Sequence, residues 1–335
     1  MRLLTRISVL LVAALLPLIP ASSQEQPAPA QKPNESPTFK ARTVLVNLTA
    51  TVTDRRHKFI TDLDEKDFRV LDEGKPQEIS FFSRQTDLPL RIGVLLDTSN
   101  SIRDRLKFEQ EAAIDFLYNT LRRDKDLAFV MTFDNEPEVI QDFTDDLDRL
   151  STIIRKQRAG GGTAFRDAIY LGSQKLMKPP APAGANPQVR RVMVVISDGD
   201  DNLSDHTLSE AMEMAERAEV AIYAISTNTD WLALDNEQAP KKIMKSHGDD
   251  VLERFSNDTG GRVFFPYRLD DLAQSFLDIG NELRSQYTLA FRPGDVGSSG
   301  QFRRIRVEVD RKGLIVRTRH GYYATAAPPA PPPGK

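Results

Sequence analysis

Four short and almost uninterrupted apolar runs in the middle of the chain constrain its fold more than any other feature. Such runs are typical of strands that are buried on both faces, as the strands of a parallel sheet are. Helical patterns separate or follow them, with apolar residues at the spacing of an amphipathic helix. The runs are Ile92 to Leu96, Leu127 to Thr132, Val192 to Ile196 and Val220 to Ile225, and the helical patterns are Arg103 to Arg122, Thr163 to Met177, Leu208 to Ala218 and Asp270 to Leu283. This alternation predicts a Rossmann-like, doubly wound α/β domain over residues 90–283 with a mostly parallel sheet, which binds ligands at the carboxyl ends of its strands.

The segments on either side of this domain alternate with a period of two, as half-buried strands do. Apolar side chains recur at Val44, Val46, Leu48, Ala50 and Val52, at Tyr287, Leu289 and Phe291, and at Ile305, Val307 and Val309. Phe68 and Val70 on one side and Ile79 and Phe81 on the other flank a turn at Asp72 to Lys75, which predicts a hairpin. Isolated hairpins are marginally stable, so we expect residues 41–85 and 287–323 to pair into one small antiparallel β domain.

The ends of the chain have the composition of processing and linker segments. Arg2 and Arg6 precede an apolar run from Ile7 to Ile19, and small residues follow. This pattern predicts a cleaved leader over residues 1–23 and export to the periplasm or the medium. An uncleaved anchor is the alternative, but the run is shorter than the roughly 20 residues that span a bilayer. Residues 24–40 and 324–335 are rich in proline and predict an extended linker and tail, so we expect no membrane span after cleavage.

Composition excludes several classes of function. The 335 residues include no cysteine, which rules out disulfides and thiolate metal sites within this sequence, so a metal would need oxygen or histidine ligands. The formal net charge of −3 argues against a nucleic-acid partner. The four histidines are scattered and no nucleophile-elbow motif is present, so a hydrolase would lack an obvious base. We treat His206 as a surface histidine without a role.

Oxygen-bearing side chains gather where the predicted strands and helices meet. Asp97-Thr98-Ser99-Asn100-Ser101 follows the first run, Gly160-Gly161-Gly162-Thr163 precedes a helix, and Ser197-Asp198-Gly199 ends the third run. Taken alone, the first string is better explained as a turn and N-cap before a helix. Together, the three loops are expected at one edge of the sheet.

This combination of Asp-x-Ser-x-Ser, Gly-Gly-Thr and Ser-Asp-Gly resembles the metal-ion-dependent adhesion site of von Willebrand factor type A domains. The resemblance covers about residues 90–283. It implies hydroxyl ligands from Ser99, Ser101 and Thr163 and carboxylates from Asp97 and Asp198. The flanks resemble bacterial secreted proteins related to this domain, of the acidobacterial type, in Asp67-Phe68-Arg69-Val70, Gln77-Glu78-Ile79 and Gly321-Tyr322-Tyr323.

The ligand set implied by the resemblance suits Mg²⁺, with Mn²⁺ or Ca²⁺ as alternatives, because hard cations prefer oxygen ligands. An ion held largely by neutral hydroxyls stays electron-poor and can accept an Asp or Glu carboxylate of a protein partner. We expect Asn100, Gly162, Asp134 and Asp200 to contact that partner. Asp134 is equally explained by an ordinary turn. For Asp200 and Asp201 a solvated helix-capping loop is the favoured explanation, with an anionic rim or a second ion site as the alternative.

The functional expectation is therefore a non-enzymatic, cation-dependent adhesion or assembly module outside the cytoplasm. Two alternatives remain at this point. In one, the protein is an envelope scaffold component in which the metal is structural. In the other, it is a hydrolase in which the ion activates water.

Overall fold

The computed structural model describes residues 45–84, 88–180, 189–228, 245–266, 269–294 and 300–324. The predicted leader and linker, Val44 and almost all of the predicted tail lie outside these residues. Within the described residues, no helix is both long and apolar enough to cross a membrane.

A six-stranded sheet with the order β10-β9-β8-β5-β6-β7 forms the centre of the fold. All neighbouring strands run parallel except β7, which pairs antiparallel with β6. The strands are β5 (Leu90–Asp97), β6 (Leu127–Phe133), β7 (Pro137–Thr144), β8 (Arg190–Ser197), β9 (Val220–Ser226) and β10 (Val263–Phe264). The four predicted apolar runs are β5, β6, β8 and β9. Their side chains are almost entirely buried, as expected for strands covered on both faces.

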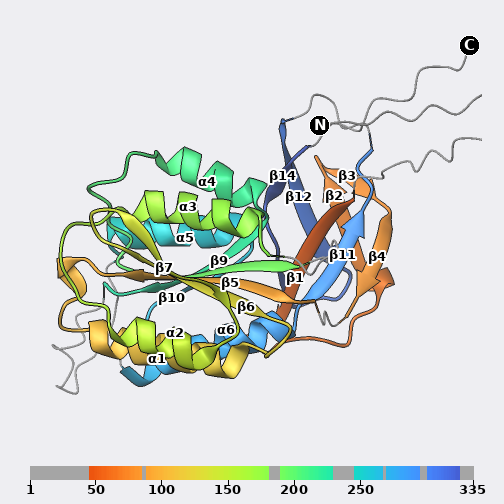
Figure 1. Ribbon diagram of the computed structural model, residues 1–335. Coiled ribbons are helices and arrows are strands. Elements are labelled where there is room, and N and C mark those ends of the chain that lie inside the picture. Colours follow the sequence, from red (N-terminus) through yellow and green to blue (C-terminus); the bar gives the residue numbers. More distant parts are fainter. Residues whose placement is uncertain are drawn as a thin grey trace, which may run out of the picture. The chain divides into compact units, whose positions relative to one another are not determined.

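Helices cover both faces of this sheet (Figure 1). One hydrophobic core holds α1 (Leu106–Thr120), α2 (Leu147–Arg155) and α6 (Leu269–Arg284) against the sheet. A second core, on the other face, holds α3 (Phe165–Met177), α4 (Leu208–Arg217) and α5 (His247–Thr259). The predicted doubly wound α/β fold with flanking antiparallel strands is therefore confirmed.

Four elements of this domain are absent from the sequence prediction: β7, α2, α5 and the two-residue strand β10. The strand β7 lies at the sheet edge, and its buried positions do not alternate regularly, so it lacks a period-two signal. The helix α5 is rich in polar residues and begins at a capping box formed by Ser246 and Asp249. The helix predicted from Arg103 begins at Leu106, after a 3-10 turn over Asn100–Ile102, and the helix predicted from Thr163 begins at Phe165.

The two flanks of the chain pair with each other, as their alternation predicts. One four-stranded sheet has the order β13-β1-β11-β4 and the other β14-β12-β2-β3. In the first, Leu48 pairs with Leu289, and in the second, Val70 pairs with Val307. Both sheets contribute to one hydrophobic core. The strands are β1 (Val46–Asp54), β2 (Phe68–Asp72), β3 (Lys75–Gln77), β4 (Ile79–Ser83), β11 (Tyr287–Phe291), β12 (Phe302–Val309), β13 (Leu314–Arg317) and β14 (Gly321–Tyr323).

The predicted hairpin between Phe68–Val70 and Ile79–Phe81 is wrong in its second strand. The partner of β2 is the short strand β3, whereas β4 leaves this sheet and pairs with β11 in the other one. The turn itself lies where the sequence predicts it. Glu73 and Gly74 both have positive φ, 48° and 77°, as a tight two-residue hairpin turn requires.

A buried polar network joins the α/β domain to the β sheets. Glu282 of α6 accepts hydrogen bonds from the Thr51 hydroxyl of β1 at 3.0 Å and from the Tyr223 hydroxyl of β9 at 2.7 Å. Arg317 of β13 forms an ion pair with the same carboxylate oxygen.

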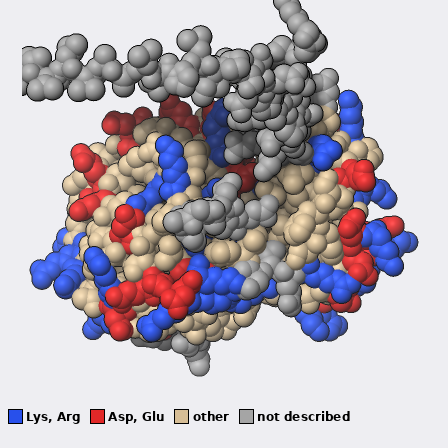
Figure 2. Space-filling view, turned by 45° about the vertical axis from the view of Figure 1, so that its right-hand side comes forward, with Lys and Arg blue, Asp and Glu red and all other residues tan. Residues whose placement is uncertain are grey.

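The surface carries mixed charge on the face seen in Figure 2, where basic side chains lie beside acidic ones.

Candidate metal centre

Asp97 is the last residue of β5, and its carboxylate is completely buried. The oxygen Oδ1 accepts a hydrogen bond from the backbone N–H of Ser99 at 2.9 Å, which shapes the turn after the strand. The oxygen Oδ2 accepts one from the Ser197 hydroxyl, at the end of the neighbouring strand β8, at 2.8 Å. The carboxylate therefore ties together the carboxyl ends of two parallel strands.

The two serines of the motif continue this network toward the surface. The hydroxyls of Ser99 and Ser101 lie 2.9 Å apart, within hydrogen-bond distance. The Ser101 hydroxyl donates to Asp198 Oδ2 at 3.0 Å. Ser99 and Asp97 are buried, Asp198 is 8% exposed, and Ser101 is exposed. Four of the five predicted ligands are thus joined by hydrogen bonds, Asp97 through the Ser99 backbone N–H and the other three through side-chain oxygens.

The glycine-rich loop lies against the Asp97 loop through its backbone. The Gly160 N–H donates to the Thr98 carbonyl at 2.7 Å, and the Gly161 carbonyl accepts from the backbone and side-chain N–H groups of Asn100 at 3.3 and 3.2 Å. Gly161 has a φ of 79°, and a Cβ there would lie 2.9 Å from the Asn135 side chain. At Gly160, φ is not positive and a Cβ would have open space around it. The backbone therefore requires glycine at position 161 but not at position 160.

Thr163, the fifth predicted ligand, is fixed in place by its backbone. Its N–H donates to Asn202 Oδ1 at 2.9 Å, and its carbonyl accepts from the N–H groups of Asn202 and Leu203. The side chain is only 6% exposed, and its hydroxyl has no hydrogen-bond partner among the residues that the structure describes. It is not hydrogen-bonded to the other four ligands but lies on the loop that adjoins theirs.

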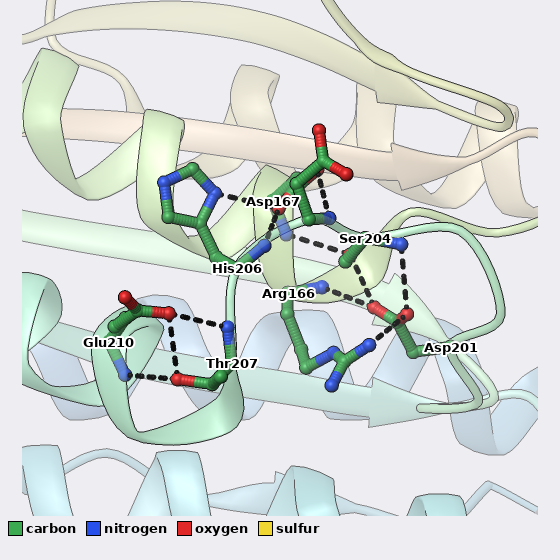
Figure 3. A network of polar contacts seen from close by, with 8 residues as sticks. Arg166, Asp167, Asp201, Ser204, His206, Thr207 and Glu210 are labelled. Atoms are coloured by element: carbon green, nitrogen blue, oxygen red, sulfur yellow. Dashed lines mark hydrogen bonds and ion pairs between the residues drawn. The ribbon is translucent and has the colours of Figure 1, made fainter.

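A network of polar contacts braces the segment after Asp198 against the start of α3 (Figure 3). Asp201 accepts hydrogen bonds from the Arg166 backbone at 2.7 Å and from its guanidinium at 2.8 Å. His206 Nδ1 lies 2.8 Å from Asp167 Oδ1, and its ring stacks on Tyr170 with centroids 3.8 Å apart. His206 is a partly exposed residue of a polar loop, and its ring and backbone both hold this segment in place, a structural contact that the sequence did not predict.

The hydrogen bonds from His206 and Asp205 also have an electrostatic effect on Asp167. Burial by itself raises the pKa of this carboxyl, but the hydrogen bonds from His206 and Asp205 outweigh burial and hold the pKa below its usual value. The Asp167 carboxylate is thus charged and fully engaged in positioning the loop.

The four residues predicted to contact a partner all lie in loops at this sheet edge. Asn100 and Asp200 are exposed, and Gly162 and Asp134 are half-buried. Asp134 lies in the turn between β6 and β7, where its carbonyl accepts from the Ala164 N–H at 2.8 Å. Asp201 accepts a hydrogen bond from the Arg166 N–H in the first turn of α3, while Asp200 stays in the loop.

Sequence reasoning missed three residues that build the site: Ser197, Asn135 and Asn202. Each contacts the site through a hydrogen bond to another loop. Ser197 directly precedes Asp198, so its place at a strand end was a usable signal. Asn135 and Asn202 carry no local signal, because their partners Gly162 and Thr163 lie far away in the sequence.

Burial and neighbouring acids raise the pKa of two carboxyl groups beneath the site. Burial, together with the charge of Asp198, raises the pKa of Asp97 to about 6, although hydrogen bonds from Ser99 and Ser197 oppose the shift. Burial likewise raises the pKa of Glu109, in α1, to about 8 against the opposing charge of Arg105. Glu109 Oε1 is buried without a hydrogen-bond partner. A cation in this place would offset the cost of burying these carboxylates.

The donor set fits a hard cation. Two carboxylates and three hydroxyls are oxygen ligands, which Mg²⁺ prefers, and one of the hydroxyls has no other partner among the described residues. Within the described part of the chain, His, Cys, Asp and Glu side chains nowhere form a group of three or more that could hold a metal ion. A site built here must therefore use hydroxyl ligands, as the sequence motif predicts.

The fold and this edge define a doubly wound α/β domain with an oxygen-rich site where its parallel strands end. The sequence matches the von Willebrand factor type A domain over residues 92–278, more than half of the chain. The chain therefore belongs to the von Willebrand factor type A domain family, whose members typically mediate protein interactions or adhesion.

Several solved bacterial structures are similar to this chain. An aerotolerance-related membrane protein from Bacteroides fragilis is 16% identical, with a TM-score of 0.43 over 58% of this chain and 98% of that one. A von Willebrand factor type A protein from Catenulispora acidiphila is 11% identical, with a TM-score of 0.46 over 86% and 75% of the two chains. The von Willebrand factor domain of the type V pili tip protein Mfa5 from Porphyromonas gingivalis is 13% identical, with a TM-score of 0.44 over 58% and 95%. No curated protein matches the sequence.

Proposed function

We propose that this protein is a divalent-cation-dependent binding module for adhesion or assembly outside the cytoplasm. Asp97, Ser99, Ser101, Thr163 and Asp198 hold Mg²⁺, or Mn²⁺ or Ca²⁺, and a partner protein supplies an Asp or Glu carboxylate to the ion. The ion's chemistry is that of a Lewis acid with an open coordination position. Binding requires no catalytic step.

The observation that carries the proposal is a hydrogen-bonded series in which the Ser99 backbone N–H binds the Asp97 carboxylate and the Ser99 and Ser101 hydroxyls lead to Asp198. These side chains come from the ends of two strands, and the packing of a parallel sheet brings those ends together. Carboxylate and hydroxyl oxygens in this arrangement are ligands for a hard cation. The Thr163 hydroxyl on the adjoining loop, which has no partner among the described residues, offers a fifth oxygen.

The position of the site at the surface supports binding of a large partner. Ser101 is exposed, and Asn100 and Asp200 on either side of it are exposed as well. A carboxylate on a protruding loop of another protein can therefore reach the ion without any opening of the fold. The location outside the cytoplasm rests on the leader pattern of residues 1–23.

Metal binding is tested first, by calorimetric titration of the full mature chain with Mg²⁺ and then Mn²⁺. We expect saturable uptake of one ion, weakened at least about tenfold in Asp97→Asn, because this change removes one of two carboxylate ligands while keeping its shape. The matched control is Asp115→Asn, which neutralises an exposed acid on α1. Absence of uptake of either ion by the folded wild-type chain refutes the proposal.

Partner binding is then tested by affinity capture from bacterial envelope extracts in Mg²⁺, followed by elution with chelator. The proposal expects a protein that elutes with chelator and is not captured by Asp97→Asn. Capture that survives both chelator and Asp97→Asn, with only the melting temperature lowered, would instead assign the metal a structural role in a scaffold protein.

A further inference from the structure

A cavity lies near the amino ends of the strands of the central sheet, whereas the candidate metal centre lies at their carboxyl ends. Its volume is about 400 Å³. Arg190 and Arg191, which line it, are the first two residues of β8, whereas Asp198 follows the last residue of that strand. The opposite wall belongs to the β sheets, through Asn47 of β1 and Thr288 of β11. The cavity is thus lined by both parts of the fold and shares no residue with the candidate metal centre.

The charge that lines this cavity is predominantly positive. Three arginines, Arg190, Arg191 and Arg319, line it together with a single acid, Glu219. Burial lowers the pKa of Arg190 to about 10, so this guanidinium stays charged at neutral pH. A partly enclosed space with an excess of guanidinium groups attracts anions.

Arg319 is held rigidly but is incompletely used. The residue is 9% exposed. Its Nη2 donates to the Asn47 carbonyl at 2.8 Å and to Glu219 Oε1 at 3.0 Å, so the planar group has a fixed orientation. Its Nε and Nη1 atoms are buried and have no hydrogen-bond partner among the residues that the structure describes. Unmade hydrogen bonds from a buried charged group are costly, and a bound acceptor would remove this cost.

Two other polar atoms in the cavity wall are in the same condition. Within the described part of the chain, Arg191 Nε and the Thr288 hydroxyl are buried without a hydrogen-bond partner. The other side of the Arg191 guanidinium is occupied, since Nη1 donates to the Ala218 carbonyl at 3.1 Å and lies 3.6 Å from Glu219 Oε2. Glu219 therefore contacts both guanidinium groups and fixes their orientation. Both groups keep N–H donors that have no acceptor among the described residues.

We propose that this cavity binds a small oxyanion, a carboxylate or a phosphate group, through Arg319 and Arg191 with the Thr288 hydroxyl as a further donor. Guanidinium groups match the oxygen geometry of both anions, and a hydroxyl can donate to either. Because the cavity walls come from the α/β domain and from the β sheets, the bound anion links the two and stabilises their junction. The site is independent of the cation site and of the function proposed for it.

The test is calorimetric titration of the full mature chain with inorganic phosphate, and separately with acetate, at constant ionic strength in the presence of EDTA. Chelator keeps the cation site out of the measurement. We expect saturable binding of at least one of the two anions, and the tighter one identifies the class. Arg319→Gln and Arg191→Gln should each weaken it about tenfold or more, because each removes charge-assisted hydrogen bonds.

The matched control is Arg155→Gln, which removes the same charge from an exposed ion pair with Glu111 at 2.8 Å. It should bind the anion as the wild type does. If Arg319→Gln does not fold by circular dichroism, Arg191→Gln and the isosteric Thr288→Val answer the same question. Absence of binding of both anions, or equal affinity in Arg191→Gln, Thr288→Val and the wild type, overturns the proposal.

Discussion

The Ser101 hydroxyl donates a hydrogen bond to Asp198 Oδ2 at 3.0 Å, although 97 positions of sequence separate the two residues. The parallel pairing of β5 with β8 brings them together, because it aligns Leu96 with Ile196 and so places both strand ends at one edge. The first and third motifs are therefore joined by a direct contact between side chains.

Replacing Ser101 by alanine should weaken Mg²⁺ binding about tenfold, since it removes one of the proposed oxygen ligands and the hydrogen bond to Asp198. Ser101 is exposed, so the free energy of unfolding without metal should change by less than about 0.5 kcal/mol. Calorimetry and urea unfolding measure the two effects separately. Ser209→Ala, an exposed serine in α4, serves as the control, and equal Mg²⁺ affinity in the two variants would contradict the ligand assignment.

Gly199→Ala should destabilise the fold by about 2 kcal/mol or more, because alanine is strained at positive φ and its Cβ would clash with the neighbouring backbone. Gly199 has a φ of 75°, and a Cβ would lie 2.3 Å from the Gly248 carbonyl oxygen. Gly160→Ala, at a position with open space, should change stability by less than about 0.5 kcal/mol. Urea unfolding compares them, and similar values for the two variants would show that this close approach is not required.

Glu282→Ala should lower the free energy of unfolding by about 3–5 kcal/mol, because it leaves Arg317 without its buried counterion. It also removes the acceptor for the Thr51 and Tyr223 hydroxyls. The comparison is Asp62→Ala, which breaks an exposed ion pair with Arg311 and should cost no more than about 1 kcal/mol. Equal losses in urea unfolding would mean that the network does not hold the junction.

The titration of one residue, Glu216 of α4, should lower the free energy of unfolding as pH rises from about 4.5 to 7. Burial, with the charge of Asp258 adding to it, raises the pKa of Glu216 from its ordinary value of 4.5 to about 7. In this window the folded state binds more protons than the unfolded state, so deprotonation favours unfolding. Glu216→Gln should therefore reduce the fall in melting temperature between pH 5 and pH 8.

Glu111→Gln is the control for this pH profile. The hydrogen bond from Arg155 lowers the pKa of Glu111 below its ordinary value, so this carboxyl is ionised throughout the range from pH 5 to pH 8. The variant should keep the wild-type slope of melting temperature against pH. A wild-type slope in Glu216→Gln would show that this carboxyl does not carry the effect.

The central sheet and most of the site's residues follow from the sequence by itself. The runs that became β5, β6, β8 and β9 are continuous apolar stretches, and burial on both faces of a sheet demands that pattern locally. The motif residues stand directly after strand ends or before a helix, so the rule that parallel strands end together is enough to gather them. This rule was sufficient to place Asp97 and Asp198 at the same end of the sheet.

Only the tertiary structure decided the partners that depend on long-range register. The strand β4 pairs with β11 instead of completing the hairpin. Its mixed burial pattern is compatible with either sheet, so local periodicity could not decide its partner. Asn202 bonds to Thr163, and Arg319 lies beside Glu219, through contacts between segments far apart in the chain. Local periodicity records which side chains are buried. It does not record which buried polar atoms meet, and that is settled only when strands and helices pack against each other.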